Sequence, residues 1–184
     1  NYLALPKLTD EKPTVFTLHD MWCMTGHCAV SYDCDKWKSG CGKCPYPWTH
    51  PAVLRDATDW EWKLKKWAYE RSHFTVIAVS EWLAEQARNS LLNRFQIKRI
   101  YNGVDTETYY PVDKSLARTA LEIPLKKKVL MFSSVNLKNF GKGSDLLIKA
   151  LTGLPDSLKK ETTLLTMGNN GETLAREAGI PCID

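Results

Sequence analysis

Four cysteines lie close together in the stretch Gly26–Cys44, and their spacing could hold a metal ion. Cys28, Cys34, Cys41 and Cys44 are separated by five, six and two residues, so the string ends in a C-x2-C pair. The tight turn inside such a pair aims both sulfurs the same way, and two further thiolates complete a tetrahedron with Zn–S bonds of about 2.3 Å. Because four protein ligands leave no open position, the sequence predicts a structural zinc and no catalytic metal.

Other uses of these thiols stay open at this point. The C-x5-C-x6-C-x2-C string is not a standard zinc spacing, so unligated thiols, disulfides and redox chemistry remain alternatives. The absence of a secretion signal counts against disulfides, because cytosolic thiols stay reduced. His27 could act as the base of a catalytic cysteine, although a nucleophile needs no set of four. His27 could also replace one cysteine as a ligand, and Cys23 is a spare candidate.

His19 is the candidate catalytic residue. It stands at the end of the run Pro13–Asp20, whose β-branched and aromatic residues predict a buried strand. In open parallel sheets, ligands bind beyond the carboxyl ends of the strands. The alternative is a histidine satisfied by local backbone groups.

A third candidate site is the loop "NLKNFGKG", residues 136–143, between a predicted strand and a predicted helix. Gly141 and Gly143 would let backbone amides approach a phosphate, the helix N-terminus adds partial positive charge, and Lys142 adds a full one. The loop lacks both the P-loop spacing and the GxGxxG fingerprint, so an ordinary glycine-rich turn is the alternative.

Apolar runs and helical periodicity alternate along the chain, which predicts an α/β fold with parallel sheets. The expected strands are residues 13–20, 74–79, 97–101, 129–135 and 162–168, and the expected helices are 58–72, 80–92, 114–121, 144–151 and 171–179. The turn signal Asn102-Gly103 closes the third of these strands. A break at 102–113 suggests two domains, residues 1–103 with a cysteine-rich loop at 21–55, and residues 104–184. The chain starts at Asn1 and its last letters resemble the beginning of a strand, so we expect a fragment in which both domains are incomplete.

The tryptophans and the helix at 58–72 give a more detailed expectation. Thr58 and Glu61 are spaced as a capping box, and a face of Trp60, Leu64, Trp67 and Ala68 is expected to point inward. Trp82 is expected to join Trp60 and Trp67 in the core. For Trp22, Trp37 and Trp48, packing within the loop region is favoured over stacking on sugars.

Composition narrows the class of protein. The chain has 184 residues, 43% of them apolar and 25% charged, which is typical of a globular protein. Its net charge of +4 is spread thinly, so no nucleic-acid partner is expected. No apolar run reaches the roughly 18 residues of a membrane-spanning helix. A cytoplasmic protein is predicted, with attachment to a membrane surface left open.

Four segments in order resemble the motifs of the group 1 glycosyltransferases, a nucleotide-sugar-dependent class with the GT-B fold: "TLHDMWCMTGHC", "VSEWLAEQARNS", "YNGVDTETYYP" and "FGKGSDLLIKAL". The resemblance runs from about Thr14 to Gly171. The pattern "HDMW...TGHC...DCD.W..GCG.CP" resembles a subset associated with bacterial capsule, exopolysaccharide and lipopolysaccharide assembly. It implies two Rossmann-like domains facing across a cleft, the first on the acceptor side and the second binding the nucleotide sugar.

The resemblance also implies roles for individual residues. Lys142 would be the cation for the donor diphosphate, flanked by Gly141 and Gly143, and His19 would lie near the transferred sugar. Many relatives carry an arginine six residues before that lysine, whereas this chain has Asn136, which can donate a hydrogen bond but brings no charge. A glutamate motif that contacts the donor in the family would lie beyond Asp184.

The implied reaction is a retaining, hexosyl-type transfer from a nucleoside-diphosphate-sugar to a growing glycan or lipid-linked acceptor, commonly without a metal. The fragment alone would be inactive. A second hypothesis is a non-catalytic, metal-stabilised module that binds a glycan or a protein. A dinucleotide-dependent oxidoreductase shares the α/β pattern but would need a GxGxxG after a strand, which the chain lacks.

Overall fold

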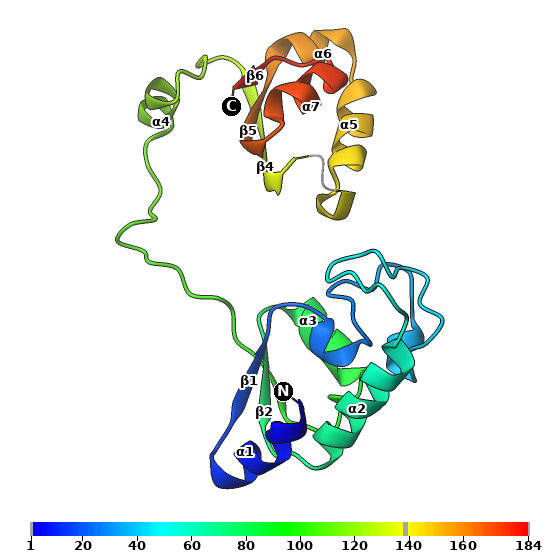
Figure 1. The fold of residues 1–184 in the computed structure, drawn as a ribbon. Coiled ribbons are helices and arrows are strands. Elements are labelled where there is room, and N and C mark those ends of the chain that lie inside the picture. Colours follow the sequence, from blue (N-terminus) through cyan, green and yellow to red (C-terminus); the bar gives the residue numbers. More distant parts are fainter. Residues whose placement is uncertain (1, 138–139, 184) are drawn as a thin grey trace. The chain divides into compact units, whose positions relative to one another are not determined.

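The computed structural model describes residues 2–137 and 140–183. The chain divides into two compact units, residues 1–105 (unit 1) and residues 106–184 (unit 2). Figure 1 shows the ribbon of each unit with its elements labelled. Each unit contains a three-stranded sheet whose neighbouring strands are all parallel, so the predicted α/β class with Rossmann-like parallel sheets is confirmed.

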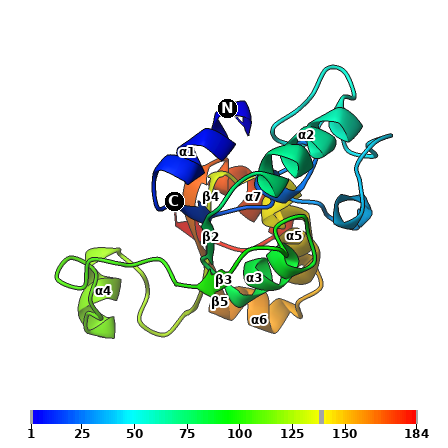
Figure 2. The ribbon, with the colours of Figure 1, turned by 90° about the horizontal axis from the view of Figure 1, so that it is seen from below.

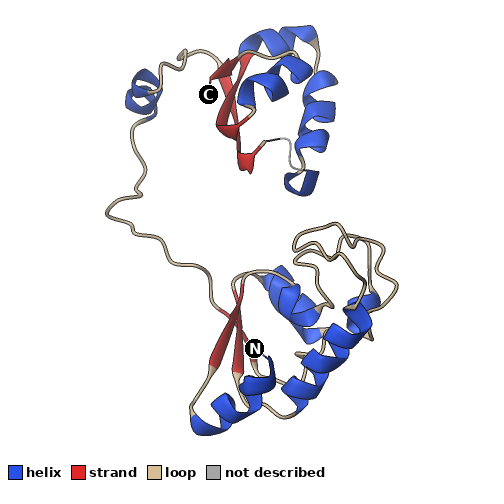
Figure 3. Cartoon of the chain, viewed as in Figure 1, coloured by secondary structure: helices blue, strands red, loops and turns tan. Residues whose placement is uncertain are grey.

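Unit 1 builds its sheet in the order β1-β2-β3, with Val15 opposite Thr75 and Val76 opposite Ile97. Its elements are the 3-10 turn η1 (Tyr2–Ala4), α1 (Leu5–Glu11), β1 (Val15–Leu18), the 3-10 turns η2 (Trp22–Met24) and η3 (Lys36–Lys38), α2 (Thr58–Glu70), β2 (Thr75–Ala78), α3 (Glu81–Arg88) and β3 (Ile97–Arg99). β3 ends two residues before the end of the strand predicted at 97–101. As Figure 3 shows, loop and two short turns fill the chain between β1 and α2.

The core of unit 1 forms where the apolar side chains of the sheet meet those of α2 and α3. Val76 and Ala78 of β2 are completely buried, and Leu83 of α3 is almost completely so. The rings of Phe74 and Phe95 stack with their centroids 3.9 Å apart. Helix α3 begins as expected from the sequence, because the hydroxyl of Ser80 accepts a hydrogen bond from the backbone N–H of Leu83 at 3.2 Å.

Helix α2 starts at Thr58 as expected, but the predicted capping box is wrong. Its N-cap residue is Ala57, which offers no side-chain cap. The carboxylate of Asp56 takes the place of a cap, because it accepts hydrogen bonds from the backbone N–H of Thr58 at 3.0 Å and from its hydroxyl at 2.6 Å.

The predicted inward face of α2 is correct for Ala68, which is buried, but the predicted core tryptophans are wrong. Trp60, Trp67 and Trp82 are 61%, 40% and 55% exposed. The buried side chains of α2 are Thr58, Trp62, Lys65, Ala68 and Tyr69. The predicted face and the observed face have the same helical spacing. The observed face can be buried although it includes Lys65, because the carbonyls of Trp22 and Thr25 replace water around the Lys65 ammonium group.

Unit 2 builds its sheet in the order β4-β5-β6, with Leu164 of β5 opposite Leu130 of β4 and Cys182 of β6. Its elements are α4 (Lys114–Ala120), β4 (Lys128–Asn136), the 3-10 turn η4 (Phe140–Lys142), α5 (Ser144–Thr152), α6 (Asp156–Glu161), β5 (Thr162–Asn169), α7 (Gly171–Ala178) and β6 (Cys182–Ile183). Buried Leu137, Leu151, Leu164 and Leu174 form the centre of its core. The short charged helix α6 was not predicted.

Gly168 allows β4 and β5 to approach closely where their register shifts. Its φ is +131°, and a Cβ atom built there would lie 1.7 Å from the carbonyl oxygen of Ser134. Only glycine fits this position without movement of the neighbouring strand. The irregularity falls between Ser133 and Asn136, at the carboxyl end of β4.

No helix within the described ranges combines the length and the apolar character that crossing a bilayer requires.

Candidate functional site

His19 lies directly after β1 and is exposed at the carboxyl end of that strand. It lines a cavity of about 390 Å³, here called the His19 pocket. The lining residues are Thr17, Leu18, His19, Asp20, Trp22, Cys23, Ala29, His50 and Pro51. The carboxylate of Asp20 accepts a hydrogen bond from the backbone N–H of Trp22 at 2.8 Å, which turns the chain away from the strand. His19 is therefore both exposed to solvent and part of the wall of this pocket.

His50 shares the pocket with His19, and sequence reasoning missed it. The two histidines belong to segments far apart in the chain, and backbone hydrogen bonds bring them together. The N–H of Met21 donates to the carbonyl of Ala29 at 2.9 Å, and the N–H of Ala29 donates to the carbonyl of His50 at 3.3 Å. Nothing in the spacing of the sequence signals this pairing, because it is made by irregular backbone.

Lys65 of α2 anchors the first part of the cysteine-rich loop (residues 21–55). Its side chain is 1% exposed, and its ammonium donates to the carbonyls of Trp22 at 2.6 Å and Thr25 at 2.8 Å. The same ammonium lies 4.3 Å from the centre of the Trp22 ring. Burial, which penalises the charged form, lowers the pKa of Lys65 to about 8. In Figures 1 and 2 the loop accordingly runs beside α2.

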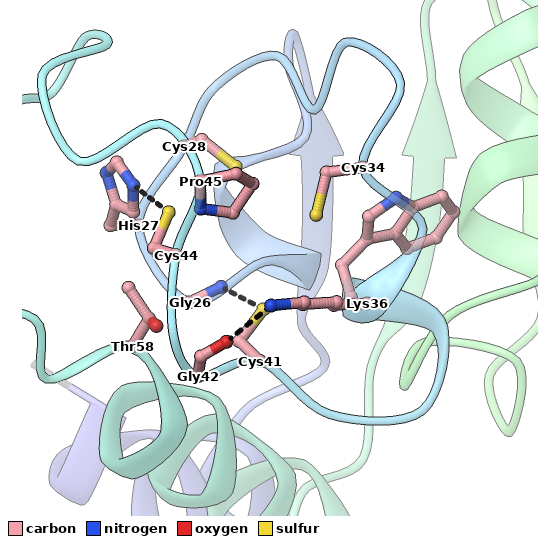
Figure 4. Close-up of a pocket in the computed structure, with 11 residues that line it drawn as sticks. Gly26, His27, Cys28, Cys34, Lys36, Cys41, Gly42, Cys44, Pro45 and Thr58 are labelled. Atoms are coloured by element: carbon pink, nitrogen blue, oxygen red, sulfur yellow. Dashed lines mark hydrogen bonds between the residues drawn. The ribbon is translucent and has the colours of Figure 1, made fainter.

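The four cysteines predicted to bind metal surround one small cavity of about 20 Å³, here called the cysteine cavity. Figure 4 shows Cys28, Cys34, Cys41 and Cys44 around it together with His27. Gly26, Lys36, Trp37, Gly42, Pro45 and Thr58 complete the lining. All six cysteines of the chain are free thiols, which places no disulfide in the loop. Within residues 2–137 and 140–183, no three His, Cys, Asp or Glu side chains are arranged to hold a metal ion.

Hydrogen bonds tie this cavity to its surroundings. The N–H of Gly26 donates to the sulfur of Cys41 at 3.2 Å. Gly26 must be small, because a Cβ atom there would lie 2.6 Å from the carbonyl oxygen of Thr58. The N–H of Cys44 donates to the carboxylate of Asp56 at 2.8 Å. Together with the hydrogen bonds from Thr58, this one lowers the pKa of Asp56 to about 2.

His27 is buried and connects the cysteine cavity with the His19 pocket. Its Nδ1 lies 2.9 Å from the carbonyl oxygen of Pro51, and its Nε2 lies 3.2 Å from the sulfur of Cys44. A carbonyl oxygen only accepts hydrogen bonds, so this network assigns the ring proton to Nδ1. Pro51 is part of the wall of the His19 pocket.

Two of the four thiols, those of Cys28 and Cys41, are poorly suited to nucleophilic chemistry. Burial raises the pKa of Cys41 to about 11 and also raises the pKa of Cys28. The reactive form of cysteine is the thiolate, which such a shift suppresses at neutral pH. These shifts argue against Cys28 and Cys41 as catalytic nucleophiles.

The residues predicted to bind the donor diphosphate lie in unit 2 at the carboxyl end of β4. Asn136 is the last residue of that strand, and Lys142 and Gly141 are exposed in η4. Gly143, with φ +77°, is the N-cap of α5. The intervening residues 138–139 of the predicted loop lie outside the described residues.

Asn170 is a further residue at this edge that sequence reasoning missed. Its amide nitrogen donates to the side-chain oxygen of Asn136 at 3.1 Å. Asn136 also pairs with Asn169 in the sheet register, which fixes the end of β4 against the end of β5. The structure thus holds Asn136 in place, while the ammonium of Lys142 sits on an exposed turn ahead of a helix N-terminus.

Comparison with known proteins gives two matches. Residues 1–108 match the family Glycosyltransferase Family 4. The chain is also 30% identical over 164 residues to WcaC of Escherichia coli (strain K12), whose name describes a glycosyl transferase of colanic acid biosynthesis. This second match covers 85% of the chain but only 39% of the relative, so the chain spans about two fifths of that protein's length. Because the family match covers more than half of its residues, the chain belongs to glycosyltransferase family 4.

Proposed function

We propose that this chain is part of a glycosyltransferase that moves a sugar from a nucleoside-diphosphate-sugar to a growing glycan in polysaccharide assembly. The observation that carries the proposal is His19, exposed in a pocket of about 390 Å³ at the carboxyl end of a parallel strand. Such strand ends are where α/β sheets bind their ligands. Family membership and the similarity to WcaC support the same class of reaction.

Unit 1 would supply the acceptor side of the reaction. The His19 pocket offers two imidazoles, from His19 and His50, and the indole ring of Trp22. Imidazoles can hydrogen-bond sugar hydroxyls, and a ring such as that of Trp22 can pack on an apolar sugar face. We assign His19 to the reacting sugar because it directly follows the strand.

Unit 2 would supply the donor side. Lys142 provides a full positive charge on an exposed turn, and the amide groups of Gly141 and Gly143 lie next to it at the start of α5. A diphosphate is stabilised by these features together. Asn136 adds a neutral hydrogen-bonding group where related enzymes often carry arginine, so the charge on the diphosphate would rest mainly on Lys142.

The transfer would proceed with retention and without a catalytic metal. The bond between the anomeric carbon and the diphosphate oxygen breaks while the acceptor oxygen bonds the same carbon from the same face. Negative charge develops on the diphosphate oxygen as its bond to the sugar breaks, and the acceptor hydroxyl passes its proton to that oxygen. Fixed positive charge at Lys142 stabilises that charge as it develops, which is the main contribution a protein can make to such a step.

The reaction would take place in the cytoplasm, at the inner surface of the membrane if the acceptor is lipid-linked. Trp60 and Trp67 are exposed on α2, and so are Lys63 and Lys66, which pair with Asp59 and Glu70 of the same helix. Aromatic rings and basic side chains together suit the boundary between lipid headgroups and water.

A glycan-binding module without catalysis is the second candidate function. Three aromatic side chains of the cysteine-rich loop favour it. The rings of Tyr32 and Tyr46 lie 5.3 Å apart, the rings of Tyr46 and Trp48 lie 6.3 Å apart, and Trp48 is 71% exposed. This module would bind a glycan through Trp48 and would bind no nucleotide.

Calorimetry on the whole protein with nucleoside diphosphates tests the proposal. We expect binding that Lys142→Ala weakens by about tenfold or more, because a hydrogen bond to a charged group contributes about 1.5–3 kcal/mol. Lys149→Ala is the matched control, since Lys149 is exposed on α5. The proposal fails if no nucleoside diphosphate binds and Lys142→Ala behaves like the control. Glycan binding that depends on Trp48 would then favour the second candidate.

A further inference from the structure

We propose that the cysteine cavity binds one zinc ion, with the thiolates of Cys28, Cys34, Cys41 and Cys44 as its ligands. These sulfur-bearing residues come from separate parts of an irregular loop, and all four line the same cavity of about 20 Å³. About 10–15 Å³ is enough for one water molecule, so the space suits a single small ion. Four thiolates are typical of zinc and of iron–sulfur centres, and the room for a single ion favours zinc over a cluster.

The loop has little regular secondary structure of its own. Between Leu18 and Thr58 the chain forms no strand or α-helix, and η2 and η3 are its regular elements. Long segments of this kind cost conformational entropy, and buried Met21, Met24 and Trp37 anchor this one at only a few points. A metal ion that joins four points of the segment would offset that cost.

Hydrogen-bond donors surround the proposed ion. The N–H of Gly26 already donates to the sulfur of Cys41 at 3.2 Å. Trp37 lines the cavity and is 2% exposed, and its indole N–H is buried with no hydrogen-bond partner in the described structure. A buried donor without a partner costs about 1–3 kcal/mol. A metal-bound thiolate in the cavity would provide the acceptor that this N–H lacks.

Charge at the cavity also fits a zinc–thiolate cluster. Four thiolates around one Zn²⁺ carry a net charge of −2. Lys36 lines the cavity, and its ammonium is held there by the carbonyls of Gly42 at 3.0 Å and Lys43 at 2.7 Å. These carbonyls belong to the turn between Cys41 and Cys44. The ammonium therefore lies beside the C-x2-C pair, where it would offset part of the negative charge.

His27 is the positioning residue of this site. Its Nδ1–H donates to the carbonyl of Pro51, and its Nε2 lies 3.2 Å from the sulfur of Cys44. A metal-bound thiolate has no proton to donate, so in the zinc-bound form the ring would hold that sulfur as an imidazolium whose Nε2–H donates to it. Groups that orient metal ligands in this way typically change metal affinity 10-fold to 100-fold when they are removed. Because Pro51 belongs to the wall of the His19 pocket, the zinc would also fix that wall.

Metal binding must draw the sulfurs together. Among the residues that the structure describes, no three potential ligands are already close enough together to hold an ion. The turn around Cys41 and Cys44 contains Gly42 with φ +127° and Lys43 with φ +45°, a tight bend that already brings both residues to the cavity.

Elemental analysis of the whole protein, purified without chelator, tests the inference. We expect about one zinc per chain and a content near zero in Cys41→Ser and Cys44→Ser. Cys182→Ser is the matched control, because this thiol lies in β6 of unit 2 and its loss should leave the zinc content unchanged. His27→Ala should retain the ion but bind it 10-fold to 100-fold more weakly in competition with a chromogenic chelator.

Two further measurements keep the inference testable if a cysteine variant fails to fold. Cobalt added to the chelator-treated parent protein should give the visible spectrum of a tetrahedral, four-sulfur site. Chelation should also expose the loop to proteolysis between Val30 and Asp56 and leave unit 2 intact. Neither measurement depends on catalysis, so a failure of the zinc inference can be told apart from a failure of the proposed function.

Three results would overturn the inference. The first is protein without zinc that also binds none when zinc is added to the reduced chain. The second is an intact mass that is two hydrogens lighter for each disulfide. The third is a zinc site that survives Cys34→Ser but is lost in His27→Ala, which would replace the four-sulfur set with three sulfurs and a histidine.

Discussion

The ammonium nitrogen of Lys65 lies 2.6 Å from the carbonyl oxygen of Trp22, and this contact joins the middle of α2 to the loop that follows His19. A second hydrogen bond, to the carbonyl of Thr25 at 2.8 Å, makes the same lysine a two-point anchor. The position of the loop beside the His19 pocket therefore depends on a charge buried in the core of unit 1.

Replacement of Lys65 by methionine should destabilise unit 1. Methionine fills similar space, but it leaves the carbonyls of Trp22 and Thr25 buried without a donor, at about 1–3 kcal/mol each. We expect the free energy of unfolding in urea to fall by about 2 kcal/mol or more. Lys63→Met is the matched control, because Lys63 is an exposed residue of the same helix that pairs with Asp59. Equal stability of the two variants would show that the anchor contributes nothing.

The orientation of α2 can be tested with its tryptophans. Trp62 is 8% exposed and its indole N–H donates to the carbonyl of Trp37 at 2.9 Å, whereas Trp60 is 61% exposed. Trp62→Ala should lower the free energy of unfolding by about 3–5 kcal/mol. Trp60→Ala should change it by about 0.5 kcal/mol or less. The free energies are measured by urea unfolding followed by circular dichroism. A larger loss for Trp60→Ala than for Trp62→Ala would show that the Trp60 face of α2 packs inward, as expected from the sequence.

The sequence predicts the framework of unit 1 well because its strands are short apolar runs with few alternatives. The N-cap at Ser80 is also a local signal, and it is correct. The face of α2 could not be predicted in the same way. Trp60 counts as apolar and Lys65 as polar, but the solvation of Lys65 depends on carbonyls from a distant loop.

The candidate site was predictable to a similar degree. Residues that follow a strand, such as His19, can be found because the strand itself can be found. His50 could not, because irregular backbone hydrogen bonds bring it to the pocket. In unit 2, the bond from Asn170 to Asn136 depends on the register of β4 and β5, which periodicity does not specify.

Gly168→Ala should destabilise unit 2. The new Cβ atom would lie 1.7 Å from the carbonyl oxygen of Ser134, and the φ of +131° is unfavourable for alanine. Strain of this kind costs about 1–3 kcal/mol, and movement of β4 would add to it. Gly153→Ala is the control in the same unit, since its nearest neighbour would be 3.5 Å away. The measurement is the midpoint temperature of thermal unfolding. Equal midpoints for Gly168→Ala and Gly153→Ala would contradict the close approach of β4 and β5 at Gly168.

The central claim is that His19 takes part in sugar transfer, and turnover by the whole protein tests it most directly. The measurement is the rate of sugar transfer from nucleotide-sugar donors to a polysaccharide-assembly acceptor, for the parent, His19→Ala and His73→Ala. His73 is an exposed histidine of the same unit and does not line the His19 pocket. We predict that His19→Ala lowers kcat by about 100-fold or more with unchanged nucleotide affinity, and that His73→Ala behaves like the parent. Full turnover by His19→Ala would contradict the account.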